Sequence, residues 1–186
     1  MQRLVILDRD GVINHDSPEF VKTADEWRPI EGSIAAIARL SKAGFTVAVA
    51  SNQSGIGREL LDEADLESMH DKLRSLVRDS GGELGHIVYC PHLPDAGCLC
   101  RKPLPGLYQQ LGELYEVSLD GVPVVGDKAR DLDAARAVNA RPILVLTGGG
   151  VATAAEIDRR GETVETFADL AAVAAQLLAE SGEAAS

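Results

Sequence analysis

The chain has 186 residues, with 18 Lys and Arg against 29 Asp and Glu, which gives a formal net charge of −11 at pH 7. This length, with 45% hydrophobic and 25% charged residues, fits one globular domain. The acidic balance excludes a general nucleic-acid binder, which needs a surface rich in Lys and Arg. The longest apolar runs fall far short of the roughly 20 residues of a membrane helix. Because Asp8, Arg9 and Asp10 interrupt the first apolar run, we expect no signal peptide. We therefore expect a cytoplasmic protein, and we expect it to be a monomer.

Short apolar runs alternate with helical patterns along the chain. In chain order the patterns predict strand 4–7, helix 34–40, strand 46–50, helix 66–77 with Asp62 as its N-cap, strand 86–89, helix 107–115, strand 122–125, helix 132–138, strand 143–146 and helix 170–178. So regular an alternation predicts the α/β class, with one doubly wound, Rossmann-like parallel sheet. We expect one domain over residues 1–179 and a flexible tail over 180–186.

Polar clusters directly follow four of the predicted strands. They are Asp8-Arg9-Asp10, Ser51-Asn52-Gln53-Ser54-Gly55, the stretch from Cys90 to Lys102, and Gly126-Asp127-Lys128. In open α/β sheets, ligands bind just beyond the carboxyl ends of the strands. The four clusters are therefore expected to meet at one edge of the sheet and to form the functional site.

Asp8, Asp10 and Asp127 offer three carboxylates at this edge. A carboxylate can attack phosphorus to form an acyl phosphate, and a second one can act as general acid and base. Two carboxylates together with carbonyl and phosphate oxygens also suit Mg²⁺. The Asp8-x-Asp10 pattern alone is more typical of a polar turn than of a catalytic pair. The third acid, Asp127, favours a catalytic site.

The remaining polar groups are weak signals one by one. Ser51 and Asn52 can donate hydrogen bonds to phosphate oxygens, and Lys102, beside Arg101, can offset the charge of a transferring phosphoryl group. Lys128 and Asp131 also fit an ordinary first helical turn. The glycine run at 147–150 lacks the Lys-Ser/Thr of a nucleotide-binding loop, so a flexible turn is favoured.

All three cysteines lie within eleven residues, in the pattern Cys90-x-His92-x5-Cys98-x-Cys100. Three thiolates and one imidazole make a closed tetrahedral shell that suits structural Zn²⁺. The spacing differs from the common Cys-x2-Cys pair, and free thiols are the alternative. An odd cysteine count without a secretory signal argues against a disulfide framework.

Four motifs together resemble the phosphatase motifs of the haloacid dehalogenase superfamily, in order and spacing, over nearly the whole chain. The stretches are Asp8-Arg9-Asp10-Gly11-Val12-Ile13-Asn14, Ser51-Asn52-Gln53-Ser54-Gly55, Cys98-Leu99-Cys100-Arg101-Lys102-Pro103 and Gly126-Asp127-Lys128. The resemblance implies the haloacid dehalogenase fold, with a small zinc-binding loop at 90–100 and no large cap domain. It also implies a phosphatase that uses Mg²⁺.

By this resemblance Asp8 is the nucleophile and Asp10 the general acid and base, while Ser51 and Lys102 hold the phosphoryl group. Asp8, the main chain of Asp10 and Asp127 would bind Mg²⁺. The residues expected to contact a sugar phosphate substrate are Asp16, Ser17, Pro18 and Glu19 of one loop, with Ser51, Asn52, Gln53, Ser54, Arg101, Lys102 and Lys128.

By the same resemblance, the zinc loop is similar to that of the branch of enzymes that act on heptose bisphosphate or histidinol phosphate. The resemblance favours removal of the 7-phosphate of a heptose 1,7-bisphosphate, in the synthesis of lipopolysaccharide core precursors. Histidinol phosphate is the alternative, because the zinc loop has the length found in histidinol phosphatases. Ser54 argues against it, since those enzymes tend to carry an acid there. A third hypothesis is a zinc-containing interaction module on an inactive scaffold, although no catalytic residue is missing.

Overall fold

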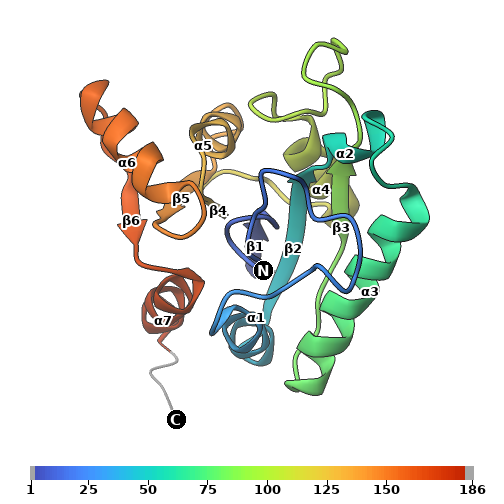
Figure 1. The fold of residues 1–186 in the computed structure, drawn as a ribbon. Coiled ribbons are helices and arrows are strands. Elements are labelled where there is room, and N and C mark those ends of the chain that lie inside the picture. Colours follow the sequence, from blue (N-terminus) through green and yellow to red (C-terminus); the bar gives the residue numbers. More distant parts are fainter. Residues whose placement is uncertain (1–2, 183–186) are drawn as a thin grey trace.

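The structure, a computed structural model, describes residues 3–182. One six-stranded sheet forms its centre, with all neighbouring strands parallel and in the order β3-β2-β1-β4-β5-β6 (Figure 1). The strands are β1 (Arg3–Leu7), β2 (Phe45–Asn52), β3 (Ile87–Cys90), β4 (Pro123–Gly126), β5 (Arg141–Val145) and β6 (Glu165–Phe167). The helices are α1 (Ser33–Lys42), α2 (Ser54–Gly57), α3 (Glu63–Asp79), α4 (Gly106–Tyr115), α5 (Ala129–Arg136), α6 (Gly150–Arg159) and α7 (Leu170–Glu180).

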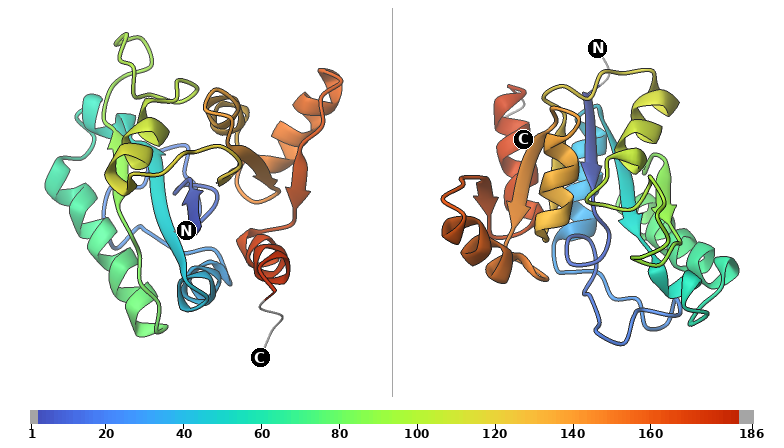
Figure 2. Two further views of the ribbon diagram at one scale, coloured as in Figure 1. Left: turned by 180° about the vertical axis from the view of Figure 1, so that it is seen from behind. Right: turned by 90° about the horizontal axis from the view of Figure 1, so that it is seen from above.

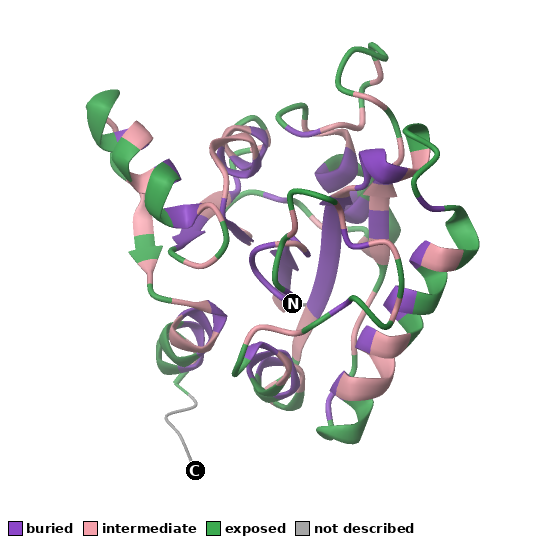
Figure 3. Cartoon of the chain, viewed as in Figure 1, coloured by how far each residue is buried: buried purple, intermediate pink, exposed green. Residues whose placement is uncertain are grey.

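Strand β1 shows how the sheet is buried on both faces. Its residues Leu4 and Ile6 pack into a core with α4 and α5, whereas Val5 and Leu7 pack into a second core with α1, α3 and α7. Successive side chains of a strand point to opposite faces, so a continuous apolar run fills both cores. Figures 1 and 2 show the helices around the sheet, and Figure 3 shows that their inner sides are buried. The predicted doubly wound fold is confirmed.

Three elements were not predicted from the sequence: α2, α6 and β6. Strand β6 has only three residues, and none of them is fully buried. Helix α6 buries Gly150, Thr153 and Ile157, of which only Ile157 is a large apolar residue. Both therefore lack the apolar periodicity on which the predictions depend. Among residues 3–182, no helix is long and apolar enough to cross a membrane.

The ends of two predicted elements differ from expectation. Strand β2 continues through Ser51 and Asn52, which pair with Tyr89 and Cys90 of β3, so these two side chains stand on the sheet itself. Glu180, predicted to start the tail, is the last residue of α7, and its carboxylate accepts hydrogen bonds of 2.7 and 2.8 Å from Arg141. Residues 183–186 of the predicted tail lie outside the described residues.

The long connection from β1 to α1 is held against the core by a few buried residues. Val21 and Trp27 pack among the helices α1, α3 and α7. The Lys72 ammonium of α3 donates to the carbonyl oxygens of Ala24 at 2.6 Å and Trp27 at 2.9 Å. The Ser33 hydroxyl donates to the carbonyl oxygen of Ile13 at 2.7 Å. The connection thus runs as an ordered loop beside the carboxyl ends of the strands.

Candidate active site

A buried ion pair network lies at the carboxyl end of β1. Lys102 extends its ammonium to Asp8 Oδ1 at 2.9 Å, to Asp131 Oδ1 at 2.7 Å and to the carbonyl oxygen of Ala50 at 2.9 Å. Burial raises the pKa of Asp8 to about 7, although Lys102 opposes the shift. Burial favours the neutral amine of Lys102, but the charges of Asp131 and Asp8 raise its pKa above the ordinary value. Lys102 therefore stays charged beside Asp8, as a phosphoryl-transfer site requires.

Asp127, at the end of β4, completes a group of three buried acids. Carboxylate oxygens of Asp8, Asp127 and Asp131 all lie within 4.8 Å of one another. Asp127 Oδ2 accepts a hydrogen bond from the Gly149 N–H at 2.7 Å, whereas its buried Oδ1 has no partner among the described residues. Burial raises the pKa of Asp127. A buried oxygen without a partner, in a cluster with three acids and one lysine, fits a divalent cation.

Two glycines let the backbone approach Asp127 closely. A Cβ at Gly11 would lie 2.2 Å from Asp127 Oδ2, and one at Gly148 would lie 2.3 Å from the same atom. Both glycines also have positive φ, of 87° and 57°. The glycine run after β5, predicted to be a flexible turn, therefore packs directly over the acidic cluster. Gly149 caps Asp127, and Gly150 begins α6.

Asp10 is held by three side chains. The Arg9 guanidinium contacts both its oxygens, at 3.0 and 3.1 Å, while Asn14 donates to Oδ1 and Gln53 to Oδ2, each at 2.8 Å. Burial alone would raise the pKa of Asp10, but Arg9, Asn14 and Gln53 together lower it below its ordinary value. Asp10 is therefore ionised in this arrangement.

The cluster after β2 positions neighbouring groups. Gln53 donates to the Ser51 hydroxyl oxygen at 2.8 Å and so links Ser51 to Asp10. Asn52 makes two bonds to the backbone of Lys102: its Nδ2 donates to the carbonyl oxygen at 3.0 Å, and its Oδ1 accepts from the N–H at 3.1 Å. The strand β2 thus fixes the segment that carries Lys102.

A cavity of about 220 Å³ opens above these groups. It is lined by Asp8, Arg9, Asp10, Asp16, Ser17, Phe20, Val21, Ser51, Asn52, Gln53, Ser54, Arg101, Lys128 and Arg130. Asp16 reaches across to Lys128, with 2.6 Å between carboxylate and ammonium. Pro18 lines a neighbouring hollow with Lys128 and Gly148, whereas Glu19 is exposed and lines neither. Of the four loop residues predicted to face substrate, Asp16 and Ser17 are brought to this cavity.

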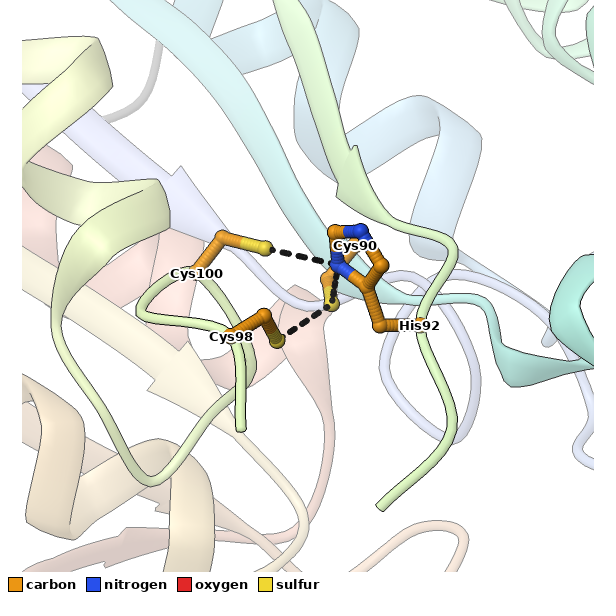
Figure 4. Close-up of side chains that lie close together, drawn as sticks. All are labelled: Cys90, His92, Cys98 and Cys100. Atoms are coloured by element: carbon orange, nitrogen blue, oxygen red, sulfur yellow. Dashed lines mark hydrogen bonds between the residues drawn. The ribbon is translucent and has the colours of Figure 1, made fainter. Parts of the chain in front are cut away.

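The cysteines and His92 meet in one cluster, as the spacing predicted (Figure 4). Cys90 Sγ lies 3.7 Å from Cys98 Sγ and 3.5 Å from His92 Nδ1, which is 3.3 Å from Cys100 Sγ. A zinc ion with Zn–S bonds of about 2.3 Å separates its tetrahedral sulfur ligands by about 3.8 Å. The spacing of the four donor atoms therefore fits Zn²⁺. All three cysteines are free thiols in this structure.

Sequence reasoning missed the residues that support the predicted ones. Arg9 and Asn14 were read only as part of a motif, yet both are buried and bind Asp10. Asp131 was read as an ordinary helical residue, and it does cap α5 by accepting from the Lys128 N–H at 3.0 Å. It also binds Lys102, for which the sequence gives no signal. Arg130 also lines the cavity, and no sequence pattern singles it out.

Comparison with known proteins gives a consistent result. Residues 99–172 match the HAD-hydrolase-like family. A Pseudomonas aeruginosa protein named D-glycero-beta-D-manno-heptose-1,7-bisphosphate 7-phosphatase is 60% identical over 94% of this chain and 97% of its own length. A relative of the same name from Bordetella bronchiseptica is 51% identical over 96% of this chain and 99% of its own. The chain belongs to this family of heptose bisphosphate phosphatases. It is therefore a phosphoric monoester hydrolase.

Solved structures agree with this assignment. The crystal structure of D,D-heptose 1,7-bisphosphate phosphatase from B. bronchiseptica, in complex with magnesium and phosphate, has a TM-score of 0.92 to this chain. It is 50% identical, and the match covers 97% of this chain and 99% of that one. The corresponding enzyme from Burkholderia thailandensis has a TM-score of 0.74 at 40% identity, over 95% and 99% of the two chains. The haloacid dehalogenase fold expected from the motifs is thus confirmed.

Proposed function

We propose that the chain removes the 7-phosphate of D-glycero-β-D-manno-heptose 1,7-bisphosphate through a phosphoryl intermediate on Asp8. The observation that carries the proposal is the placement of Asp8 beside Lys102 in a buried acidic cluster, where the cavity reaches the end of β1. The substrate and its β anomer are taken from the names of relatives up to 60% identical to this chain. Such an activity would belong to the synthesis of lipopolysaccharide core precursors.

In the first step Asp8 attacks the 7-phosphorus, and the bond between phosphorus and the sugar oxygen breaks. Asp10 gives its proton to the departing sugar oxygen; because Arg9, Asn14 and Gln53 lower its pKa in the substrate-free protein, it must take up that proton as the substrate binds. In the second step a water attacks phosphorus, Asp10 takes its proton, and Asp8 is released with inorganic phosphate. The lowered pKa keeps Asp10 ionised, so that its carboxylate can accept the proton of the water. Lys102 and Ser51 hold the phosphoryl oxygens in both steps.

Two metal ions fit the chain's own donors. Mg²⁺ would be held by Asp8, the main-chain oxygen of Asp10 and Asp127, and when bound it offsets the charge of the phosphoryl group. Asp131 would lie outside this set of ligands and would orient Lys102. Zn²⁺ would be held by Cys90, His92, Cys98 and Cys100, in a closed shell with no position for a catalytic water. It would fix the backbone directly before Arg101 and Lys102.

The remaining proposed contacts follow the lining of the cavity. Ser17, Ser54 and Arg101 line the cavity, which supports their proposed contact with the sugar or its second phosphate. We assign Asn52 and Gln53 mainly to positioning Lys102, Ser51 and Asp10, because their amides are already engaged there. Pro18 and Glu19 are proposed only as the outer rim of the substrate loop. A cytoplasmic, monomeric enzyme stays a prediction.

The proposal is tested by comparing kcat/KM for both anomers of heptose 1,7-bisphosphate, histidinol phosphate and common sugar monophosphates, with Mg²⁺ and zinc-loaded protein. We expect the β-bisphosphate to exceed every other substrate by at least about tenfold. A tenfold preference for histidinol phosphate would replace the proposed substrate. Absence of turnover on all of them would favour the inactive scaffold with an interaction role.

A further inference from the structure

Arg9 is the buried cation that holds Asp10, and one of its donors has no acceptor. Its side chain is only 1% exposed. The Nε and Nη2 atoms bind Asp10, and Nη2 also donates to Gln53 Oε1 at 3.2 Å. Its Nη1 is buried as well, but it has no hydrogen-bond partner among residues 3–182. A buried donor without an acceptor lowers stability, so we expect a nearby group to satisfy it.

His70 of α3 carries a buried acceptor that also lacks a partner. Its side chain is 1% exposed, and its ring lies against that of Tyr89, with 6.0 Å between the ring centroids. The Nδ1 atom lies 3.6 Å from Glu67 Oε2, so this carboxylate favours the tautomer with the proton on Nδ1. In this tautomer Nε2 is an acceptor, and it has no partner within the described part of the chain.

The fold brings Arg9 and His70 to the same face of the sheet. Leu7 packs into the core that α1, α3 and α7 cover, and side chains two residues apart on an extended chain point to one face. Arg9, two residues after Leu7, therefore lies on the side of α3. His70 packs against Tyr89 of β3, the strand beside the one that leads to Gln53, which Arg9 also binds.

The charges around His70 keep its ring neutral. Burial and the positive charge of Arg9 lower the pKa of His70 to about 4, an effect that Arg74 strengthens and Glu67 opposes. The influence of Arg9 on this pKa requires the guanidinium to lie near the ring. At pH 7 the imidazole is therefore neutral, and only a neutral imidazole can accept a hydrogen bond from a cation.

We propose that His70 is a positioning residue for catalysis: its Nε2 accepts the unpartnered Nη1–H of Arg9, directly or through one ordered water, and so fixes the guanidinium that holds Asp10. This inference rests on the acid–base role proposed for Asp10. With Nη1 held by His70, Nε and Nη2 stay directed at the two oxygens of Asp10. Without that acceptor the guanidinium turns away from this alignment, and Asp10 no longer meets the departing oxygen in the right geometry.

The first test uses two leaving groups. The sugar oxygen of heptose 1,7-bisphosphate needs a proton in order to leave, whereas the nitrophenolate of 4-nitrophenyl phosphate does not. The ratio kcat/KM is compared because it covers the steps up to the loss of the leaving group. We expect His70→Leu to lower kcat/KM by about tenfold for the bisphosphate and by less than about threefold for the nitrophenyl ester. Equal losses on both would indicate a merely structural role and would overturn the proposal, as would an unchanged value for the bisphosphate.

A conservative variant separates the acceptor from the ring. The side-chain oxygen of His70→Gln can occupy the place of Nε2, so this variant should recover at least half of the lost activity on a logarithmic scale. A His70→Gln protein no better than His70→Leu would contradict the role of the acceptor. His86→Leu is the control, because His86 is exposed and its ring packs on Tyr115, at 5.3 Å between centroids. It should leave both substrates unchanged.

Failure of the proposed substrate is distinguishable from failure of this inference. A wild type that is active on histidinol phosphate but not on heptose bisphosphate would refute the proposed substrate alone. Histidinol phosphate also releases an alkoxide, so it should then show the tenfold loss in His70→Leu, and an unchanged value would again overturn the proposal. A wild type without any phosphatase activity would overturn both.

Nitrogen NMR of the zinc- and Mg²⁺-loaded protein tests the contact without turnover. We expect His70 to carry its proton on Nδ1, and not on Nε2, and to remain neutral down to about pH 5.5, well above its pKa of about 4. The Nη1 resonance of Arg9 should move in His70→Leu and return toward its wild-type position in His70→Gln. A proton on Nε2 of His70, or an Arg9 resonance that does not respond to His70→Leu, would contradict the proposal.

Discussion

The acidic cluster and the cysteine cluster are both candidate metal sites, but the chain supports them differently. Asp8 and Asp127 directly follow central strands β1 and β4, and both are almost fully buried. In the cysteine cluster only Cys90 belongs to a strand, while the other donors lie on a loop whose Leu99 is 80% exposed. The sheet therefore preforms the acidic site, whereas three of the four donors of the cysteine cluster depend on the conformation of a loop. We expect changes in the first site to abolish chemistry and changes in the second to weaken it.

The largest effect is expected from Asp8→Asn, because an amide is a feeble nucleophile toward phosphorus and a poorer Mg²⁺ ligand. Turnover should fall by several orders of magnitude, while circular dichroism and zinc content stay unchanged. Asp120→Asn, in an exposed turn, is the control and should keep full activity. If Asp8→Asn retained a tenth of the wild-type kcat, Asp8 would not be the nucleophile.

The next effect is expected from Asp131→Asn, which removes one of the two carboxylates that hold Lys102. Breaking a buried ion pair should lower the free energy of unfolding by about 3 kcal/mol. A misplaced Lys102 should also lower kcat by about thirtyfold. Denaturant titration and steady-state kinetics check both, with Asp133→Asn as the control, because Asp133 lies half-buried on the same helix and pairs with Arg136 and not with Lys102. Unchanged kcat would show that Asp131 does not position Lys102.

The acidic site should also respond to pH, because burial raises the pKa of Asp8 to about 7 in the metal-free protein. Mg²⁺ needs the ionised carboxylate, so protonation of Asp8 competes with it. The apparent Kd for Mg²⁺ should therefore rise about tenfold from pH 8 to pH 6. Calorimetry with zinc-loaded protein measures this. A Kd independent of pH over that range would contradict the raised pKa.

The smallest effect is expected at the cysteine cluster. Cys98→Ala should release zinc and loosen the segment before Arg101 and Lys102, lowering kcat/KM by about fivefold. Secondary structure should persist, because the sheet is built without this loop, and Mg²⁺ should still be required. Asp95→Ala in the same loop should keep both zinc and activity. Full activity in a folded, zinc-free Cys98→Ala protein would remove the positioning role of the metal.

Much of the fold was predictable because its signal is local. Each strand that carries site residues is a short apolar run, and β1 fills both cores with four consecutive residues. The shared edge of Asp8, Ser51, Lys102 and Asp127 then follows from a parallel sheet. The cysteine cluster was predictable because its donors lie within eleven residues.

The rest depends on contacts between residues distant in sequence. Nothing local distinguishes Asp131, which binds Lys102, from an ordinary helix-capping acid. Arg9 is a charged residue that becomes fully buried only because Asp10 and Gln53 pair with it. Helix α6 and strand β6 have too few large apolar residues to show a period. The engagement of Asn52 with the Lys102 backbone likewise requires the fold to be known.

The central claim is that the phosphoryl group passes through Asp8. A rapid-quench experiment tests it: Mg²⁺- and zinc-loaded protein is mixed with heptose 1,7-bisphosphate, stopped with acid within one turnover, and digested for mass spectrometry. The account predicts that the peptide containing Asp8 gains the mass of one phosphoryl group, and that the mass disappears as inorganic phosphate is released. A phosphoryl group on any other residue, or a full turnover of phosphate with Asp8 unmodified throughout, would contradict it.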